Sequence, residues 1–294
     1  MKLAIGLPAF NEENNLAKII VKLEKIADRI IVCNDGSTDA TGLIAERLDT
    51  IVINHSKNLG YGASIKSIFN RAKEENFDVL VTFDADGQHT ISDIEKVIKP
   101  IKDGKADLVI GSRFLEENKK IPNYRKVGIK IITKVSNFSI KNDISDSQSG
   151  FRAYNKKALE LINASDSGMG ISTEILIKAS KNNLLIAEVP INVSYEGDTS
   201  THNPIFHGSS VLLSTIKFMS IENPLKFYGI PGIIFLVIGL FFIIWTIDIF
   251  SETRQIVTNI SLIGIGAIIL GIIMLMNAII LYSLVSVVRE QQSN

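Results

Sequence analysis

The sequence predicts an α/β domain with a mainly parallel sheet, followed by two helices long and apolar enough to cross a membrane. Three observations support this fold class. Residues 1–115 alternate between short apolar runs and amphipathic segments, as in a sheet covered by helices on both faces. Polar clusters follow three of the expected strands. The mean hydropathy is +0.24 although 21% of the residues are charged, so the apolar excess must be concentrated in one part of the chain.

The expected elements follow from hydrophobic periodicity. Short apolar runs predict strands at Lys2–Leu7, Arg29–Cys33, Thr50–Ile53, Asp78–Phe83 and Asp107–Ile110. Amphipathic segments predict helices at Glu12–Ala27, Ala40–Leu48, Gly62–Glu74 and Ile91–Lys102. The single cysteine, Cys33, lies in an expected strand and is expected to fill the core. Ligands of such sheets bind beyond the carboxyl ends of the strands, so the polar clusters that follow the strands are candidate ligand-binding segments.

The C-terminal part is expected to form a transmembrane hairpin over residues 227–289, with helices at about 227–249 and 257–288. No charged residue occurs from 227 to 247 or from 255 to 288, and each run exceeds the roughly 20 residues that span a bilayer. Buried core helices are the alternative. Lys217, Lys226 and Arg289 flank the outer ends, so the positive-inside rule places both termini and the N-terminal domain in the cytoplasm. Two helices per chain also allow a homo-oligomer.

The most informative polar cluster follows the fourth expected strand and contains two carboxylates. Asp84 and Asp86 are one residue apart, so along an extended chain their carboxylates point to the same side. They can share a hard divalent cation with phosphate oxygens, and Gln88 adds a neutral oxygen. A strand-end Asp-Gly is also an ordinary turn signal. The clusters at 8–12 and 34–39 follow the first two strands, where they could also simply cap helices.

Several other ligand classes are excluded by spacing. The glycines of residues 58–63 do not follow G-x-G-x-x-G, and no acidic ribose ligand follows at the expected interval. They indicate either a tight entry into the third helix or a phosphate or base contact. There is no Walker A pattern and no Cys/His cluster for zinc. With a formal net charge of +0, no nucleic-acid partner is expected.

Together these segments resemble family 2 glycosyltransferases with the GT-A fold, in the branch of dolichyl-phosphate mannose synthases and polyprenyl-phosphate glucosyltransferases. The resemblance covers Met1 to Tyr195 and implies a GT-A catalytic domain over residues 1–203. The matching motifs are Pro8-Ala-Phe-Asn-Glu12, Asn34-Asp35-Gly-Ser-Thr-Asp39, Asn58-Leu-Gly60, Asp84-Ala-Asp86-Gly-Gln88-His89, Gly111-Ser-Arg113 and Ser149-Gly-Phe-Arg152.

The resemblance implies a nucleotide-sugar donor, a polyprenyl-phosphate acceptor, and Mg²⁺ or Mn²⁺ as cofactor. Pro8, Ala9, Phe10, Glu12 and Asp35 would hold the base and ribose. Asp84, with Ala85, would lie near the ribose or metal, and Asp86 with Gln88 would bind the metal on the diphosphate. Arg113 would face the donor phosphates or sugar. Asn34 replaces the usual first aspartate of its motif and Phe10 a frequent tyrosine, so the nucleotide, like the sugar, stays open.

Residues 119–141 are expected to contact the membrane surface. They hold seven basic residues and no acidic one, with Val127, Ile131, Val135 and Phe138 at helical spacing. An apolar face beside a cationic face suits an anionic bilayer, although a solvated helix is the alternative. A second interfacial helix is expected at 204–226. By the resemblance, Arg125 faces the phosphates and belongs to the catalytic set with Asp84, Asp86 and Arg113.

The acceptor phosphate is also expected to meet a loop before the second interfacial helix. His202 lies close to the place where the polyprenyl branch often has a basic residue, and His207 follows. Either imidazole could donate a hydrogen bond to the phosphate, whereas a loop histidine is more often a bystander. Arg125 and His202 are therefore the acceptor-phosphate candidates.

The acceptor class decides whether a general base is needed. A sugar hydroxyl must lose a proton as it attacks, whereas a polyprenyl phosphate already carries an anionic oxygen and needs positioning. The chain has neither a Thr-Glu-Asp motif nor Gln-x-x-Arg-Trp, which mark processive polysaccharide synthases of the superfamily. Glu174 is the one acidic residue near the place of such a base, and we expect it to be helical and structural or substrate-contacting.

The sequence therefore predicts inverting transfer of a hexose from a nucleotide-sugar to polyprenyl or dolichyl phosphate at the cytoplasmic leaflet. Two alternatives stay open. Transfer to a lipid hydroxyl would need Glu174 or another carboxylate as base. A non-catalytic nucleotide-sugar-binding membrane adaptor would not need the intact set of Asp84, Asp86, Gln88 and Arg113.

Overall fold

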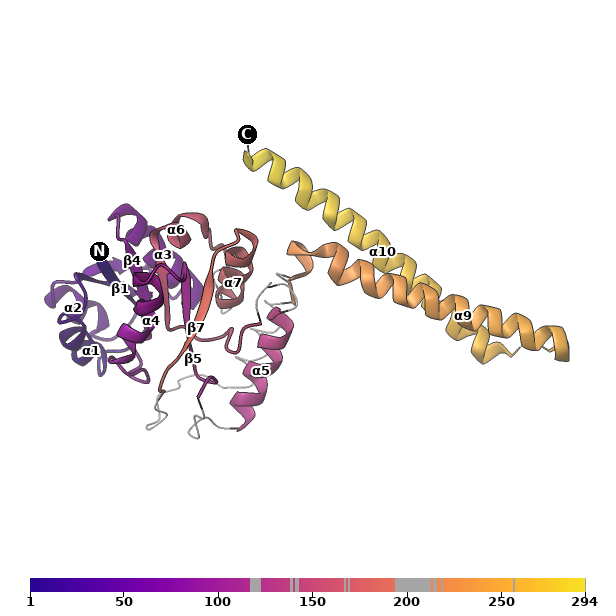
Figure 1. The fold of residues 1–294 in the computed structure, drawn as a ribbon, viewed down its shortest axis with the longest axis horizontal. Coiled ribbons are helices and arrows are strands. Elements are labelled where there is room, and N and C mark those ends of the chain that lie inside the picture. Colours follow the sequence, from indigo (N-terminus) through magenta and orange to yellow (C-terminus); the bar gives the residue numbers. More distant parts are fainter. Residues whose placement is uncertain are drawn as a thin grey trace. The chain divides into compact units, whose positions relative to one another are not determined.

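The computed structural model describes two compact units, Met1–Thr215 and Ile216–Asn294 (Figure 1). The described residues are 1–116, 123–137, 140, 143–166, 168, 170–193, 213, 216–217, 219–255 and 257–293, without the side chains of 123–125 and 288–293.

The first unit is built on a seven-stranded sheet with the order β3-β2-β1-β4-β6-β5-β7. Its strands are β1 Leu3–Ala9, β2 Arg29–Asn34, β3 Ile51–Asn54, β4 Val79–Thr82, β5 Leu108–Ser112, β6 Arg152–Asn155 and β7 Ile186–Pro190. All pairs are parallel except those of β6, which runs antiparallel to both β4 and β5. The prediction of a mainly parallel sheet is thus confirmed.

Helices follow the strands in the predicted order. They are α1 Leu16–Leu23, α2 Thr41–Arg47, α3 Tyr61–Glu74, α4 Asp93–Lys102, α5 Asn123–Asn137, α6 Lys156–Leu161 and α7 Ile171–Lys181. The first helix was predicted from Glu12 to Ala27 and is shorter at both ends. At its start, Asn11 has a φ of 56°, which helical residues do not adopt, and the residues that follow form a turn.

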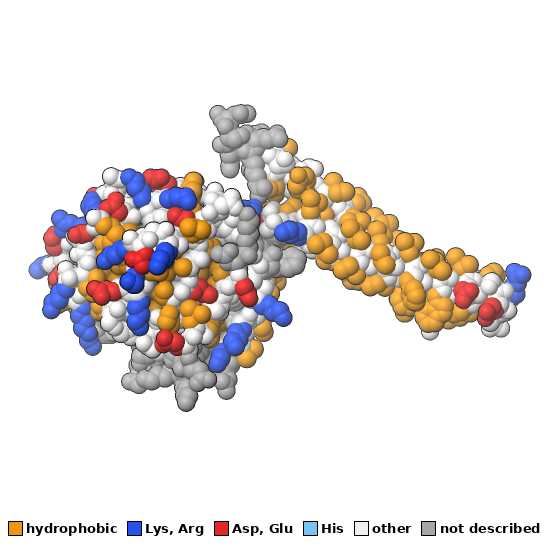
Figure 2. Space-filling model, in the orientation of Figure 1, with side chains coloured by type: hydrophobic (Ala, Val, Ile, Leu, Met, Phe, Trp, Pro, Cys, Tyr) orange, Lys and Arg blue, Asp and Glu red, His pale blue; other side chains and the backbone are white. Residues whose placement is uncertain are grey.

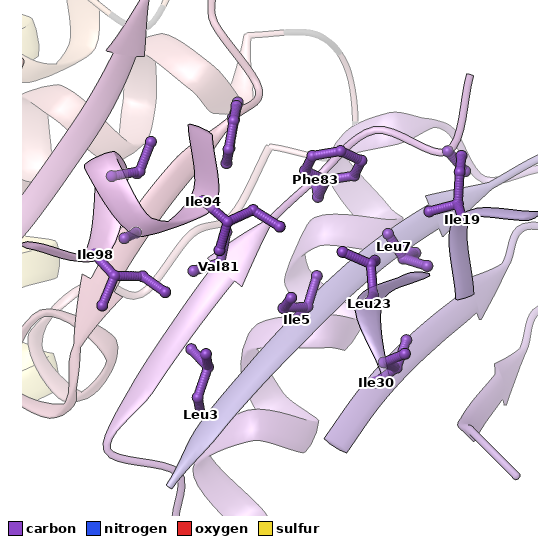
Figure 3. Packing of buried hydrophobic residues seen from close by; sticks show 14 of the residues in the cluster. Leu3, Ile5, Leu7, Ile19, Leu23, Ile30, Val81, Phe83, Ile94 and Ile98 are labelled. Carbon is purple, nitrogen blue, oxygen red and sulfur yellow. The ribbon is translucent and has the colours of Figure 1, made fainter. Parts of the chain in front are cut away.

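The core lies between the sheet and the helices on its two faces. Leu3, Ile5 and Leu7 of β1 are buried against α1 and α4, in the cluster that Figure 3 shows. On the opposite face, α3 approaches β1 closely at Gly6. A Cβ there would lie 2.3 Å from the Ile68 Cγ2 atom, so only glycine permits this packing. Glycine at this position therefore lets α3 pack directly against β1.

The second unit is a helical hairpin. A π-helical turn at Leu225–Gly229 leads into α9 Ile230–Thr253, and α10 Thr258–Ser293 returns. Hydrophobic side chains cover the hairpin along its length (Figure 2), and the stretches Leu225–Thr253 and Thr258–Val287 are long and apolar enough to cross a membrane. The two predicted apolar helices are thereby confirmed.

Glycines let the two helices of the hairpin pack backbone to backbone. A Cβ on Gly239 would lie 2.9 Å from the Gly264 carbonyl oxygen, and one on Gly271 would lie 2.8 Å from the Gly232 carbonyl oxygen. Small residues at such crossings allow the close van der Waals contact that holds helices together in lipid. One side of α10 is therefore committed to α9.

Candidate active site

Hydrogen bonds join the loops after β1 and β2 at the carboxyl edge of the sheet. The Asn11 N–H donates to Ser37 Oγ at 3.0 Å, and Asn11 Oδ1 accepts from the Thr38 N–H at 2.9 Å. The Glu12 N–H donates to Thr41 Oγ1 at 2.8 Å. Asn11 therefore holds the two loops together rather than capping the first helix.

The predicted donor-site residues at the end of β1 differ in exposure. Ala9 is buried, whereas Phe10 is 37% exposed. Burial raises the pKa of Glu12, and the nearby carboxylates of Asp86, Asp39 and Asp84 raise it further, although Asn15 opposes this shift. The loops after β1, β2 and β4 thus bring their carboxylates together, as the motifs predicted.

Asp35, a predicted base or ribose ligand, is a buried hydrogen-bond centre that is 4% exposed. Its Oδ1 accepts from the Leu59 N–H at 3.0 Å and its Oδ2 from the Gly60 N–H at 2.8 Å. His55 Nδ1 lies 2.6 Å from Oδ1. A carboxylate offers about four lone-pair positions, so the glycine loop takes about half of its capacity and His55 takes a further position. A direct contact to the nucleotide stays a prediction.

Behind Asp35, Cys33 is fully buried, with its Sγ 3.6 Å from His55 Nε2. Burial raises the pKa of the Cys33 thiol to about 11. The thiol is therefore neutral and unreactive at physiological pH, and the prediction that it fills the core is confirmed.

Two proton donors orient Asp84. Burial and the neighbouring Asp84 carboxylate raise the pKa of the Tyr61 hydroxyl well above its usual value, and the hydroxyl bonds to that carboxylate. His89 Nε2 lies 3.2 Å from Asp84 Oδ2, and its ring is held between Phe83 and Phe151, with centroid distances of 5.6 and 5.2 Å. The sequence motif contained His89 but gave no signal for Tyr61, which reaches Asp84 from the start of α3.

Asp86, the predicted metal ligand, has little competition from protein donors. Its Oδ1 accepts from the Gln88 N–H at 2.9 Å, and burial together with Asp84 raises its pKa. Among the described residues, no group of three or more His, Cys, Asp or Glu side chains could hold a metal. Mg²⁺ is often held by one or two carboxylates plus substrate phosphates. The donor set therefore fits a cation shared with a diphosphate.

Arg113 is held by a buried carboxylate that the sequence did not identify. Its Nε and Nη2 donate to Asp146 at 2.7 and 2.8 Å. Burial alone would raise the pKa of Asp146, but the Arg113 guanidinium lowers it below the usual value. Glu188 of β7 in turn accepts the N–H groups of Ser145 and Asp146 at 2.8 and 3.1 Å. The predicted contact of Arg113 with donor phosphates stays a prediction.

Arg152, the last residue of the Ser-Gly-Phe-Arg motif, is a structural cation. It is 1% exposed and donates to the carbonyl oxygens of Ser147, Ser149 and Ser172 at 2.7, 2.8 and 2.9 Å. Arg152 therefore ties the 147–149 segment to the start of α7. The segment leads into Gly150, whose Cα lies beside Asp84 and Tyr61.

Glu174 is helical and structural, as expected. It lies in α7 with no exposed surface. Its Oε1 accepts from the Ser165 N–H at 2.8 Å and lies 2.7 Å from Lys178 Nζ, and its Oε2 accepts from the Asp166 N–H at 2.7 Å. Burial would raise its pKa, but the bonds from Lys178 and Ser165 lower it below the usual value. A carboxylate committed in this way is a poor general base.

Replacing Glu174 with glutamine is expected to lower stability but to retain substantial turnover per folded molecule. The amide removes the ion pair with Lys178 and turns one acceptor into a donor, which we expect to cost about 2 kcal/mol. Because the folded-state pKa is lowered, the carboxylate stabilises the fold above the unfolded-state value of 4.5 and loses this effect as pH falls below it. Thermal unfolding at pH 7 and 4 measures the difference in stability between the wild type and E174Q. A thousandfold loss of kcat in folded E174Q would contradict the structural role of Glu174.

Helix α5 carries an exposed apolar stripe beside exposed lysines. Val127 and Ile131 are 57% and 52% exposed, next to Lys126 and Lys130. The opposite side of the helix is buried in the first unit at Ile132. The predicted apolar and cationic faces therefore adjoin on the outer side of α5.

Several predicted residues lie outside the described parts of the chain. The backbone of Arg125 belongs to α5, but its side chain is not described. His202, His207 and Phe138 lie outside the described residues. The segment expected at 204–226 is described only in part.

A mainly parallel sheet with carboxylates gathered beyond β1, β2 and β4 defines a GT-A type glycosyltransferase domain. The chain belongs to Glycosyl transferase family 2, whose model matches residues 4–162. The fold is shared with glucosyl-3-phosphoglycerate synthase from Mycobacterium tuberculosis in complex with Mn²⁺, UDP and glucosyl-3-phosphoglycerate. That match has a TM-score of 0.57 and 17% identity, and it covers 74% of this chain and 79% of the other.

Two relatives from archaea are similar in sequence. UDP-N-acetylglucosamine–dolichyl-phosphate N-acetylglucosaminyltransferase of Methanococcus voltae is 34% identical over 229 residues, covering 70% of this chain and 89% of the relative. Dolichol-phosphate mannosyltransferase of Pyrococcus furiosus is 33% identical over 202 residues, covering 65% and 56%. These similarities agree with the prenyl-phosphate branch of the family.

Proposed function

We propose that the protein transfers a hexose from a UDP- or GDP-linked donor to polyprenyl or dolichyl phosphate, with inversion, at the cytoplasmic face of a membrane. An oxygen of the acceptor phosphate attacks the anomeric carbon while the bond from that carbon to the nucleotide diphosphate breaks. From an α-linked donor, the product is a β-linked lipid-phosphate sugar, and the nucleoside diphosphate leaves. The names of the M. voltae and P. furiosus relatives support the acceptor class.

The state of Glu174 is the observation that carries the choice of acceptor. Its carboxylate is buried and bonded to Ser165, Asp166 and Lys178, so it is not available to deprotonate a hydroxyl. An acceptor that is already ionised needs no such base. This favours a phosphate over a lipid hydroxyl.

The residues of the carboxyl edge have separate proposed roles. Phe10 and Glu12 contact the base and ribose. Asp84 accepts a hydrogen bond from a hydroxyl of the nucleotide-sugar, while Tyr61 and His89 fix the orientation of the Asp84 carboxylate. Asp86 and Gln88 hold Mg²⁺ or Mn²⁺, which when bound neutralises charge on the diphosphate. A divalent cation of this kind accompanies UDP in the M. tuberculosis structure.

The membrane supports capture of the acceptor. The exposed apolar and cationic side of α5 and the segment at 204–226 lie against the bilayer surface, and α9 and α10 cross it with both chain termini in the cytoplasm. Arg125 and His202 meet the lipid phosphate as it enters.

One assay tests the proposed function. The purified full chain is incubated with Mg²⁺ or Mn²⁺, a panel of labelled UDP- and GDP-sugars, and polyprenyl phosphate, and both released nucleotide and labelled lipid are measured. We expect labelled lipid in proportion to released nucleotide. Transfer only to diacylglycerol or a lipid-linked sugar would replace the proposal with the hydroxyl acceptor, and no turnover with any donor would favour the adaptor.

Replacing His202 with alanine is expected to raise the apparent KM for polyprenyl phosphate about tenfold, with little effect on the KM for the nucleotide-sugar. The reason is the loss of one hydrogen bond to a charged group, which is typically worth 1.5–3 kcal/mol. His207→Ala is the matched control and should have a smaller effect. Equal changes for both substrates, or none, would make His202 a bystander.

A further inference from the structure

The side of α10 that faces away from α9 carries an amide in the middle of an apolar helix. From Leu262 to Leu281, Asn277 is the only residue with a nitrogen or oxygen in its side chain. The Asn277 side chain is exposed, and it has no hydrogen-bond partner among the residues that the structure describes. The observation needs an explanation if this stretch lies in a membrane, and in that respect the inference rests on the proposed function.

The depth of Asn277 makes the missing partner costly. The candidate span ends at Val287, ten residues further on, which at 1.5 Å per residue is about 15 Å. Hydrocarbon is about 30 Å thick, so Asn277 lies well inside it. A carboxamide carries two donors and one acceptor group, and hydrocarbon satisfies none of them.

The residues around Asn277 form a second packing stripe on α10. The side facing α9 follows a heptad spacing, with members that contact α9 or are buried against it: Gly264, Ile268, Gly271, Leu275 and Ala278. A second set of residues, each two positions later in the sequence, has the same spacing. We call this set the outer stripe: Gly266, Leu270, Ile273, Asn277 and Ile280.

The outer stripe lies on the opposite side of the helix and has no partner among the residues that the structure describes. Two residues correspond to about 200° of rotation. Leu270, Ile273 and Ile280 are 43%, 50% and 51% exposed, and a Cβ on Gly266 would meet no atom within 4 Å. A heptad of apolar residues with one asparagine is the pattern by which a helix specifies a partner helix and its register.

We propose that the outer stripe of α10 binds the same stripe of a second copy of this chain in the membrane. All copies insert with the same orientation, so a two-fold axis must run along the membrane normal and each residue meets its own counterpart at the same depth. Asn277 then donates to and accepts from Asn277 of the second copy. The open position at Gly266 lets the two helices approach closely.

Lipid chains and the polyprenyl chain are poorer occupants of this surface. Both are hydrocarbons at the depth of Asn277 and offer no donor or acceptor. A second copy satisfies the amide by symmetry and requires no further component. The helix pair leaves α9 on the far side of each α10, so the hairpin packing through Gly239 and Gly271 is unaffected.

Cysteine cross-linking of the full chain in lipid vesicles tests the interface. Cys33→Ala removes the single native cysteine, and Ile273→Cys then places one thiol on the outer stripe. The matched control is Val237→Cys on α9, which is 61% exposed but outside the stripe. We expect efficient oxidative cross-linking of the Ile273→Cys variant at dilute protein-to-lipid ratios and little of the Val237→Cys variant. Equal cross-linking of the two, or none at position 273, would overturn the proposal.

Substitution of Asn277 tests the role of the amide. In the Ile273→Cys background, Asn277→Leu should reduce the cross-linked fraction about tenfold, whereas Asn277→Gln should restore most of it. An unchanged fraction in Asn277→Leu would contradict the inference. Cross-linking does not depend on turnover, so a protein that dimerises without labelling polyprenyl phosphate would refute the proposed function alone. A chain that alkaline carbonate extracts from membranes would refute both.

Discussion

Replacing Asp86 with alanine is expected to reduce turnover by about a hundredfold to a thousandfold without unfolding the domain. Asp86 lies at the carboxyl edge of the sheet, and its Oδ1 accepts from the Gln88 N–H at 2.9 Å. Burial and the Asp84 carboxylate raise its pKa. A bound cation would oppose both effects, because it stabilises the ionised carboxylate. Removing a group that stabilises charge developing on a leaving group typically costs a factor of 100 to 1,000.

The matched control for this prediction is Asp39→Ala. Asp39 belongs to the same polar edge, but its oxygens accept from the N–H groups of Thr41 and Glu13 at 3.0 and 3.2 Å, so its loss should weaken the loop and be milder in turnover. Steady-state rates with saturating Mg²⁺ or Mn²⁺, together with circular dichroism, compare the two variants. Turnover of Asp86→Ala near that of the wild type would remove Asp86 from the site.

The first half of the fold could be predicted because its signals are local. Apolar runs and amphipathic periodicity depend on residues close in sequence, and the strands and helices up to β5 occur in the expected order, with their ends shifted by a few residues. The position of β6 in the sheet cannot be predicted from local signals. Its four residues, Arg152–Asn155, pair antiparallel between β4 and β5, and this position is set by contacts with segments more than forty residues away.

The candidate site shows the same division. The motif order predicted that the loops after β1, β2 and β4 would share one edge, because parallel strands end on the same side. It did not predict that Asp35 would be occupied by the glycine loop and His55, or that Arg113 would pair with Asp146. An acidic residue in a motif indicates a candidate functional residue, but tertiary packing decides which hydrogen-bond donors reach its carboxylate. Tyr61 is the clearest case, since its hydroxyl meets Asp84 only through the close approach of α3.

Glycine at position 150 is a requirement of this same arrangement. A Cβ there would lie 2.5 Å from the Tyr61 hydroxyl oxygen and 2.8 Å from Asp84 Oδ2, well inside van der Waals contact. The Tyr61 ring and the Asp84 carboxylate both have to move to admit a methyl group. Asp84 Oδ2 also lies 3.2 Å from His89 Nε2, so a shift of the carboxylate would disturb this hydrogen bond as well.

We therefore expect Gly150→Ala to lower kcat/KM about a hundredfold, since displacing a positioning group by about 1 Å has an effect of that order. The fold should persist, because the clash involves side-chain atoms and the Arg152 bonds to its neighbours remain. Gly104→Ala is the control: its Cβ would meet no atom within 4 Å, and with a φ of +67° it should cost about 1 kcal/mol of stability and leave turnover intact. If Gly150→Ala turned over at the wild-type rate with an unchanged Tm, the contact between Tyr61 and Asp84 would have no part in catalysis. A loss of turnover that Tyr61→Phe reproduces in part would instead assign the effect to the orientation of Asp84.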